Sequence, residues 1–344
     1  MRKPMGFILF FQILSLSFTS CTRREVTPSI TVYTYDSFAQ GLGPVVAKAF
    51  LRDTGIPTRL VSFGSCGEAL NQIVLEGTST PADLLVGIDS SLVARALESH
   101  TLVEAPHAAA KLLPDSTWAP DLWLDSRRAI LPFDYGYLAF VYDSRRTSPQ
   151  SDQTLAAFAA DVKWKSRVVI EDPRTSSIGL SFLEWTRTIY TETDWKNFWQ
   201  KMSHQLVTIA PGWSSAYGLF LKKEADWVLS YTTSPAYHIE KEQNPFIHAL
   251  LFKDGHYRQV EGAATVKVST QQDLAERWLS TLLSAEVQSK VATKQWMYPV
   301  RSDVALPASF LQLVVPKPVQ TDAVSSRQRR EWIQKWVSIA AQLP

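Results

Sequence analysis

The chain has 344 residues, a length that favours two domains over one. Hydrophobic residues make up 45% and charged residues 20%, which excludes wholesale disorder and a coiled coil. The formal net charge is only +2, so the chain lacks the basic surface that nucleic-acid binding needs, and we expect no nucleic-acid partner. Its 12 Trp and 11 Tyr offer flat faces for a stacked or cationic ligand, although such residues also build ordinary cores.

The first 20 residues have the pattern of an export signal. Arg2 and Lys3 precede an apolar run that is shorter than the roughly 20 residues of a membrane-spanning helix. Residues 18–21, Phe-Thr-Ser-Cys, resemble a bacterial lipobox, in which the cysteine is acylated and becomes the first residue of the mature protein. We therefore expect residues 1–20 to be removed and the periplasmic protein to be anchored to a membrane through lipid on Cys21. The alternative is a plain signal peptide, which would leave a soluble periplasmic protein.

The cysteine and histidine residues indicate neither a disulfide nor a metal centre. If Cys21 carries lipid, Cys66 is the only thiol left, and no intramolecular disulfide can form. The six histidines show no HxxxH or HExxH spacing, and there is no cluster of Cys and His. We therefore expect no metal and no cofactor, and a fold that is stabilised by packing.

Strand and helix signals alternate through the first part of the mature chain. β-Branched and aromatic residues predict strands, and apolar residues at helical spacing predict helices. The predicted elements are a strand at 30–35, a helix at 44–52, a strand at 58–63, a helix at 67–76, a strand at 83–87 and a helix at 91–98. Such an order with short connections is typical of a mostly parallel, doubly wound sheet.

A connector at 104–121 separates this part from a long extended stretch at 129–142, and a second alternating series follows. Its predicted elements are strands at 167–171, 206–210 and 227–231 and helices at 177–190, 194–202 and 215–223. A second long strand at 257–268 and helices at 271–284, 286–294 and 328–341 complete the chain. The two long extended stretches are suited to cross between two lobes.

These elements predict an α/β protein with the two-lobe architecture of a type 2 periplasmic binding protein. Each lobe would be a doubly wound sheet, and the two extended stretches would be the crossovers between them. We expect residues 30–132 and 262–344 to form the first lobe and residues 133–261 to form the second.

Hydroxyl-bearing and aromatic residues follow the predicted strands, where ligands of open parallel sheets bind. The candidates are Tyr35, Asp36, Ser65, Cys66, Ser176, Ser177, Trp213, Tyr231, Thr232, Thr233, Ser234, Tyr237 and Trp296. For the serines, capping of the next helix is the alternative role, and each tryptophan taken singly could belong to the core. Because the aromatic residues gather at strand ends, we predict that they line one cleft for a flat cation with a hydroxyl or phosphate tail.

Several collinear motifs resemble those of the bacterial thiamine-binding periplasmic proteins, which are the receptors of thiamine ABC importers. The resemblance covers roughly residues 30–310. Its motifs are residues 33–38, 132–137, 172–176, 212–214, 216–221, 230–237, 255–257 and 296–300. The resemblance implies a protein that captures thiamine, and its mono- and diphosphate, between two lobes and delivers it intact to a permease and an ATPase.

The resemblance also implies roles for the candidate residues. Trp213 and Tyr237 would flank the rings of the ligand, and Trp296 and Tyr35 would complete the aromatic enclosure. Its hydroxyl or phosphate end would be held by Ser176 and Ser177. Further polar contacts would come from Tyr231, Thr232, Thr233 and Ser234. The strand-end position of Asp36, independently of the resemblance, suits it to neutralise the cation or to accept a hydrogen bond from an exocyclic amine. Ser65 and Cys66 stand where the family commonly has Asp-Gly beside the pyrimidine.

Two other functions remain open at this point. Thiamine-degrading enzymes share the two-lobe architecture and use a cysteine nucleophile, and Cys66 lies at the start of a predicted helix, where a thiolate is favoured. The simpler role for Cys66 is a small buried residue in place of glycine. A receptor for ferric ion would use paired tyrosines such as Tyr231 and Tyr237, but iron has no need of a tryptophan enclosure.

Overall fold

The computed structural model describes residues 29–104, 117–118, 121–321 and 324–340, so the expected signal and Cys21 lie outside the described residues. The strands are β1 (Ile30–Tyr35), β2 (Thr58–Phe63), β3 (Leu84–Asp89), β4 (Leu131–Asp143), β5 (Val168–Glu171), β6 (Leu206–Ala210), β7 (Trp227–Tyr231), β8 (Ile247–Leu250), β9 (Arg258–Thr265) and β10 (Tyr298–Pro299).

The helices that precede β5 are α1 (Asp36–Gln40), α2 (Gly43–Thr54), α3 (Cys66–Glu76), α4 (Val93–Glu98) and α6 (Leu155–Ala160). Those that follow are α7 (Ser177–Ile189), α8 (Glu192–Gln205), α9 (Trp213–Leu221), α10 (Ser234–Glu242), α11 (Gln272–Leu282), α12 (Ala285–Lys294), α13 (Ala308–Leu311) and α14 (Ser326–Ala340). Among the residues described, none of these helices has both the length and the apolar character needed to cross a bilayer.

The strands form a continuous mixed sheet in the order β2-β1-β3-β9-β4-β7-β5-β6, with β10 and β8 also paired to β4. β1 runs parallel to β2 and β3, and β5 runs parallel to β6 and β7. β9 is antiparallel to both β3 and β4. The predicted α/β architecture with two wound lobes and long crossovers is therefore confirmed.

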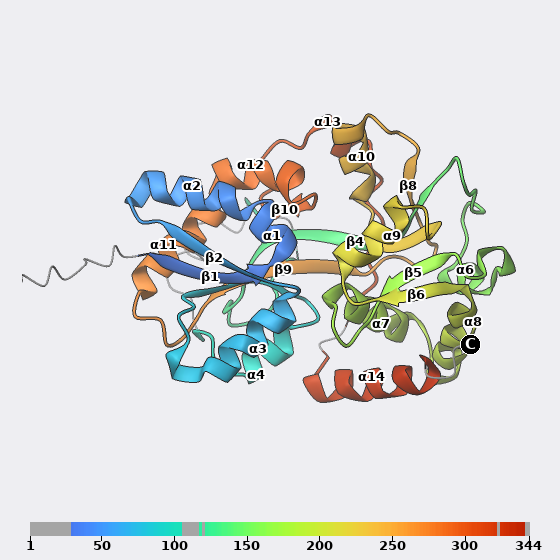
Figure 1. Cartoon of the computed structure of the whole chain (residues 1–344), viewed down its shortest axis with the longest axis horizontal. Coiled ribbons are helices and arrows are strands. Elements are labelled where there is room, and N and C mark those ends of the chain that lie inside the picture. Colours follow the sequence, from blue (N-terminus) through green and yellow to red (C-terminus); the bar gives the residue numbers. More distant parts are fainter. Residues whose placement is uncertain (1–28, 105–116, 119–120, 322–323, 341–344) are drawn as a thin grey trace, which may run out of the picture.

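One strand, β4, belongs to both lobes. Its first part, from Leu131 to Tyr137, pairs with β9, and its second part, from Leu138 to Asp143, pairs with β7 and β8. We call the part built on β1, β2, β3, β9 and β10 lobe 1 and the part built on β5, β6, β7 and β8 lobe 2. Figure 1 shows β4 and β9 running side by side from one lobe toward the other.

Helices cover both faces of each lobe because the strands are apolar on both sides. In lobe 1, α2, α11 and α12 pack on one face, where Trp278 is fully buried, and α3 packs on the other through Leu70 and Ile73. In lobe 2, α6, α7 and α8 bury an aromatic cluster that includes Phe182, and α9 covers the opposite face through Phe220. In each lobe, the carboxyl ends of the parallel strands lie between the helices of one face and those of the other.

The C-terminal helix α14 differs from the sequence prediction, which placed all of residues 262–344 in lobe 1. It packs on α7 and α8 of lobe 2, at the lower edge of the molecule in Figure 1. Trp336 is buried with its ring 5.9 Å from that of Trp199, and Arg329 is paired with the buried Glu184. The apolar face of this amphipathic helix matches the aromatic surface of α8, which short-range sequence patterns do not reveal. The remaining lobe limits stay a prediction.

The buried ring of His256 joins the segment before β9 to the middle of β4. Its Nδ1 lies 2.7 Å from the Leu138 carbonyl oxygen, and its Nε2 lies 2.9 Å from the Phe252 amide nitrogen. The amide donates to Nε2, so the ring is neutral and carries its proton on Nδ1. Burial lowers the pKa of His256 to about 4.

We expect His256 to make the stability of the fold depend on pH. A histidine in the unfolded chain has a pKa near ~6.5, so acid protonates the unfolded state first and favours unfolding. Between pH 7 and pH 5 this linkage should remove about 2 kcal/mol from the free energy of unfolding. Urea titrations at both pH values should show that His256→Gln loses less stability than the wild type. The exposed His204→Gln is the control and should behave like the wild type.

Candidate functional site

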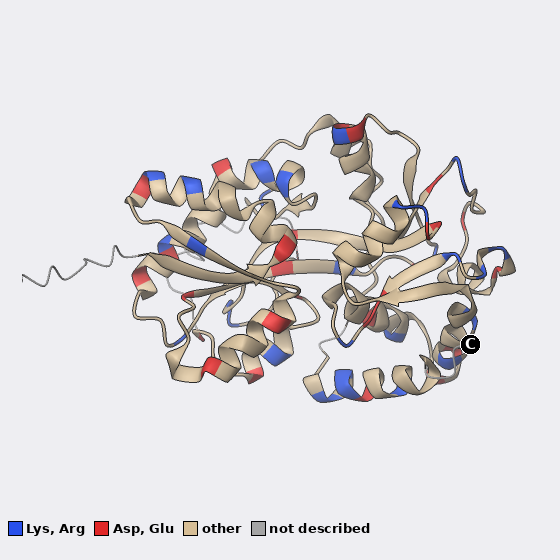
Figure 2. Ribbon diagram, in the orientation of Figure 1, with Lys and Arg blue, Asp and Glu red and all other residues tan. Residues whose placement is uncertain are grey.

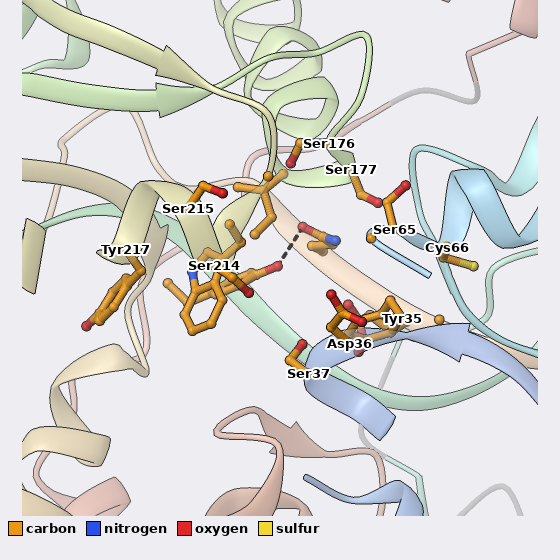
Figure 3. Close-up of a pocket in the computed structure, with 18 of the residues that line it drawn as sticks. Tyr35, Asp36, Ser37, Ser65, Cys66, Ser176, Ser177, Ser214, Ser215 and Tyr217 are labelled. Carbon is orange, nitrogen blue, oxygen red and sulfur yellow. Dashed lines mark hydrogen bonds between the residues drawn. The ribbon is translucent and has the colours of Figure 1, made fainter. Parts of the chain in front are cut away.

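A cavity of about 290 Å³ lies between the lobes, next to the carboxyl ends of β1, β5, β6 and β7. Lobe 1 lines it with residues 35–37, 64–66, 68 and 87, together with 259 and 261 on β9. Lobe 2 lines it with residues 175–178, 211–215, 217, 231, 234 and 237, and residues 295–297 close it after α12. Figure 3 shows labelled side chains of both lobes around the cavity, with Tyr35, Asp36 and Ser37 opposite Ser214.

The cavity brings together most of the residues expected from the sequence. They are Tyr35, Asp36, Ser65, Cys66, Ser176, Ser177, Trp213, Tyr231, Ser234, Tyr237 and Trp296. Thr232 and Thr233 do not line it, although the sequence predicted that they would. Both are buried, and neither hydroxyl has a hydrogen-bond partner among the described residues. The turn from β7 into α10 directs these two side chains into lobe 2, and only Tyr231 and Ser234 on either side of them reach the cavity.

Trp213 forms a fixed aromatic wall on the side of lobe 2. Its ring is stacked on that of Tyr217, with 4.9 Å between centroids and 28° between planes. Its Nε1 donates to Ser230 Oγ at 2.9 Å, and this oxygen lies 2.8 Å from Ser234 Oγ. Tyr217 is held in turn by a contact of 2.8 Å between its hydroxyl and His238 Nε2. The indole is therefore positioned before any ligand arrives, and it remains half-exposed to the cavity.

Trp296 and Tyr237 form a second aromatic pair, in which the ring centroids are 5.1 Å apart and the planes nearly perpendicular. The backbone of Trp296 has φ of 59°, in the left-handed region that favours glycine. The residue follows the C-terminal end of α12, where such a conformation commonly ends a helix. A large L-residue is thus held in a strained conformation at the cavity edge, which suggests that its side chain is needed there.

Because of this strain, two variants of Trp296 should differ in stability although both lose ligand affinity. Both Trp296→Ala and Trp296→Gly lose the ring, so both should bind ligand more weakly than the wild type. Glycine tolerates the positive φ, so Trp296→Gly should be about 1 kcal/mol more stable than Trp296→Ala. Urea denaturation of the two variants measures this difference. Equal stabilities would contradict the proposed strain.

Polar residues that the sequence analysis missed form the floor of the cavity. Tyr35 donates from its hydroxyl to the carboxyl group of Glu261 and accepts from Gln295 Nε2 at 2.6 Å. Tyr231 donates to Gln259 Oε1 at 3.1 Å. Burial and nearby carboxyl groups raise the pKa of both tyrosines well above its usual value, so their phenols stay protonated. Gln259 and Glu261 lie within β9 and not after a strand, so the search at strand ends could not find them.

The charges that line the cavity are acidic. Asp36, Glu68 and Glu261 reach it, and no Lys, Arg or His is among its lining residues in the described part of the chain. Figure 2 shows acidic positions of α1 and β9 lying near the junction of the lobes, and Glu261 is the acidic residue of β9. The carboxyl groups of Asp36 and Glu68 therefore favour a cationic ligand over an anionic one by Coulomb attraction.

Two helix N-termini meet at one end of the cavity. Ser176 caps α7 and accepts from the Gly179 amide at 3.4 Å, while α9 begins after Gly212 with no side-chain cap. Thr175 Oγ1 donates to the Pro211 carbonyl at 2.7 Å and so links the two starts. Ser176 therefore both caps α7 and lines the cavity. The uncapped amides of α9 can donate to a hydroxyl or phosphate oxygen of a ligand.

Cys66 is a buried thiol at the start of α3, and within the described part of the chain it has no disulfide partner. Burial, together with the nearby Asp89 and Glu261 carboxyl groups, raises its pKa well above the usual value. The thiol form is therefore favoured, and a thiolate nucleophile is not. Ser65 before it caps α3 by accepting from the Glu68 amide at 3.2 Å.

The chain matches known bacterial transport receptors over most of its length. Residues 46–317 match the family of bacterial extracellular solute-binding proteins. The thiamine-binding periplasmic proteins of Escherichia coli strain K12 and Salmonella typhimurium strain LT2 are 42% and 41% identical to it, each over 90% of this chain and 92% of the relative. A solved structure of a periplasmic thiamin binding protein superposes with a TM-score of 0.82 at 39% identity and covers 92% of this chain and 97% of its own. The chain therefore belongs to the bacterial extracellular solute-binding proteins and, among them, to the family of thiamine-binding periplasmic proteins.

Proposed function

We propose that this protein is the periplasmic receptor of an ABC importer and that it binds thiamine in the cavity between its lobes. The observation that carries the proposal is the combination of aromatic walls with acidic charge and no basic lining residue. Thiamine carries two flat aromatic rings, of which the thiazolium ring is positively charged, so it matches both properties. The thiamine-binding relatives that are 41% and 42% identical in sequence to this chain support the same conclusion.

The geometry of the cavity favours one orientation of the ligand. The aromatic rings would contact Trp213 on one side and Tyr35 and Trp296 on the other. Each contact between a cation and an aromatic face contributes about 0.5–2 kcal/mol. The hydroxyl end would lie at the starts of α7 and α9, where Ser176 and Ser177 line the cavity.

We infer that thiamine monophosphate and diphosphate also bind, through the same helix starts. Because the described residues that line the cavity include no basic side chain, backbone amides would meet the phosphate charge. Calorimetric titration of the purified protein with all three compounds tests the proposal. Saturable binding with one site is expected, and the absence of binding by every one of them would overturn it. Thiochrome fluorescence after oxidation of an extract would identify vitamin carried through purification.

The receptor would deliver its ligand to a permease and an ATPase after the lobes close. Small-angle scattering should then show a smaller radius of gyration when thiamine is added. We also propose that Cys21 carries lipid and anchors the protein to a membrane. Intact-mass measurement of the mature protein decides between an acylated Cys21 and a plain cleaved terminus.

The two other functions considered from the sequence are less well supported. The family consists of solute-binding proteins and not of enzymes, and the Cys66 thiol is kept protonated by burial. Full recovery of thiamine after incubation with a thiol or aniline acceptor would reject thiamine degradation directly. For ferric ion, the described residues hold no cluster of three or more His, Cys, Asp or Glu that could bind a metal. Tyr231 is a protonated phenol bonded to Gln259, which does not suit an iron ligand.

A further inference from the structure

Two acidic residues face each other across the strands that form the floor of the cavity. Asp134 of β4 and Glu261 of β9 are direct partners in the antiparallel ladder, and Asp89 of β3 is the partner of Glu261 on its other side. Direct partners project to the same face of a sheet, with Cβ atoms about 4.5–5.5 Å apart. Carboxyl groups on three neighbouring strands are thus brought together where the lobes join.

These carboxyl groups differ in their hydrogen bonding. Asp134 is completely buried, and neither of its oxygens has a partner in the described structure. Asp89 accepts from the Ser91 amide at 2.7 Å and from the Ser91 hydroxyl. Glu261 lines the cavity and accepts from the Tyr35 hydroxyl. Asp134 therefore lacks the partners that a buried carboxylate needs, whereas Glu261 is open to a ligand.

No positive charge compensates the pair. Among the described residues, no Lys or Arg forms an ion pair with Asp134 or Glu261. The titratable groups that act on the pair from the surrounding elements are Tyr35 of β1, Cys66 of α3, Asp89 of β3 and Tyr231 of β7. Arg329 of α14 acts on Asp89 and Glu184. None of these four groups on β1, α3, β3 and β7 carries a positive charge near pH 7.

Two carboxyl groups in this position cannot both be ionised without a large electrostatic cost. Burial and the neighbouring Glu261 raise the pKa of Asp134 well above its usual value. Burial, with the nearby Asp89, raises the pKa of Glu261 to about 8, even though the Tyr35 hydroxyl favours its ionised form. At neutral pH the carboxyl groups of Asp134 and Glu261 therefore hold protons at the floor of the cavity, and a positive ligand would favour ionisation of Glu261.

We propose that Glu261, coupled to Asp134, is the counter-ion of the cavity and that a cationic ligand binds by replacing a proton on Glu261. The carboxyl group of Glu261 loses its proton to solvent, and the carboxylate that remains faces the positive ring of the ligand. The inference rests on the proposed thiamine site and assigns to it a means of selecting a cation. A neutral molecule of the same shape can contact the aromatic walls, but it does not stabilise the ionised form of Glu261.

The release of protons can be measured directly by calorimetry. Thiamine is titrated into the wild type at pH 7 in two buffers of different ionisation enthalpy, and the difference in heat gives the number of protons released. We expect up to one proton per thiamine, and affinity that rises by up to tenfold per pH unit as the pH approaches ~8. The uncharged thiophene isostere of thiamine should bind more weakly and release no proton. Thiamine binding that releases no proton would overturn the proposal.

Three variants distinguish the role of the pair from a general effect of buried acids. Glu261→Gln should bind thiamine at least tenfold more weakly, with no proton release and little dependence on pH. Asp134→Asn replaces a buried carboxyl group that stays protonated with a neutral amide, so it should still release up to one proton per thiamine, as expected if the proton comes from Glu261. Glu171→Gln is the matched control, because Glu171 is also buried and unpartnered but does not line the cavity. It should release as many protons as the wild type.

The results separate the failure of this inference from the failure of the proposed function. If the wild type does not bind thiamine at all, the proposed function is wrong. If it binds thiamine while Glu261→Gln retains wild-type affinity and proton release, only the role of Glu261 is wrong. If Glu261→Gln does not fold, the buffer series on the wild type and on Asp134→Asn still decides the question.

Discussion

Trp213→Ala is expected to weaken thiamine binding by at least about 1–3 kcal/mol, or roughly 5- to 150-fold. The indole supplies the largest aromatic face on the side of lobe 2, and it is already held by stacking on Tyr217 and by its hydrogen bond to Ser230. Its loss removes the face and also leaves Ser230 with one fewer partner. Calorimetric titration of the purified variant with thiamine measures the effect.

A tryptophan outside the cavity provides the control for this change. Trp123 is half-buried in lobe 1 and does not line the cavity. Trp123→Ala should retain thiamine affinity within about twofold, even if it lowers stability. Trp213→Phe keeps an aromatic face but not the Nε1 donor, so its affinity should fall between those of the wild type and Trp213→Ala. A folded Trp213→Ala protein with wild-type affinity would show that the ligand lies elsewhere.

Gly87→Ala should both abolish tight binding and destabilise the protein. Gly87 has φ of 102° at an irregularity in the pairing of β3 with β9, between Val86 and Ile88. A Cβ added there would lie 2.3 Å from the ring of Tyr35, so the ring would have to leave its place. Tyr35 would then lose its bonds to Glu261 and Gln295, and the floor of the cavity would be rearranged. The strained backbone costs about 1–2 kcal/mol and the overpacking about 1–3 kcal/mol.

Gly55→Ala separates the two causes. Gly55 also has a positive φ, of 72°, but nothing lies within 4 Å of a Cβ added there, and the residue ends α2 away from the cavity. This variant should lose only the backbone contribution, about 1–2 kcal/mol, and should bind thiamine like the wild type. Urea denaturation and calorimetry measure both properties. Equal losses of stability in Gly87→Ala and Gly55→Ala would show that the contact with Tyr35 is unimportant.

The order of strands and helices could be predicted because each element carries its own local pattern. β1 is a run of β-branched and aromatic residues, and α2 begins at a proline-containing turn and ends at Gly55. Parallel strands align their carboxyl ends, so the positions of Tyr35, Ser176 and Trp213 near one cavity followed from the order alone.

Other parts of the site and the fold depend on contacts that local patterns do not contain. Glu261 lies in the middle of an apolar strand, and its surroundings include Asp134, which is 127 positions earlier in the sequence and opposite it in the ladder. Thr232 and Thr233 have the composition of a binding loop, but the turn into α10 directs their side chains inward. The position of α14 is set by the aromatic surface of lobe 2, which forms only when α7 and α8 have packed.

The continuity of β4 has a consequence for how the protein folds and unfolds. Because the 13-residue strand β4 pairs with strands of both lobes in one sheet, neither lobe can be expressed alone without exposing an unpaired sheet edge. The whole chain should therefore melt in one cooperative transition, and heat-capacity traces should show a single peak. Vitamin captured at the junction would then protect the full-length polypeptide, including elements far from the bound molecule, against thermal denaturation.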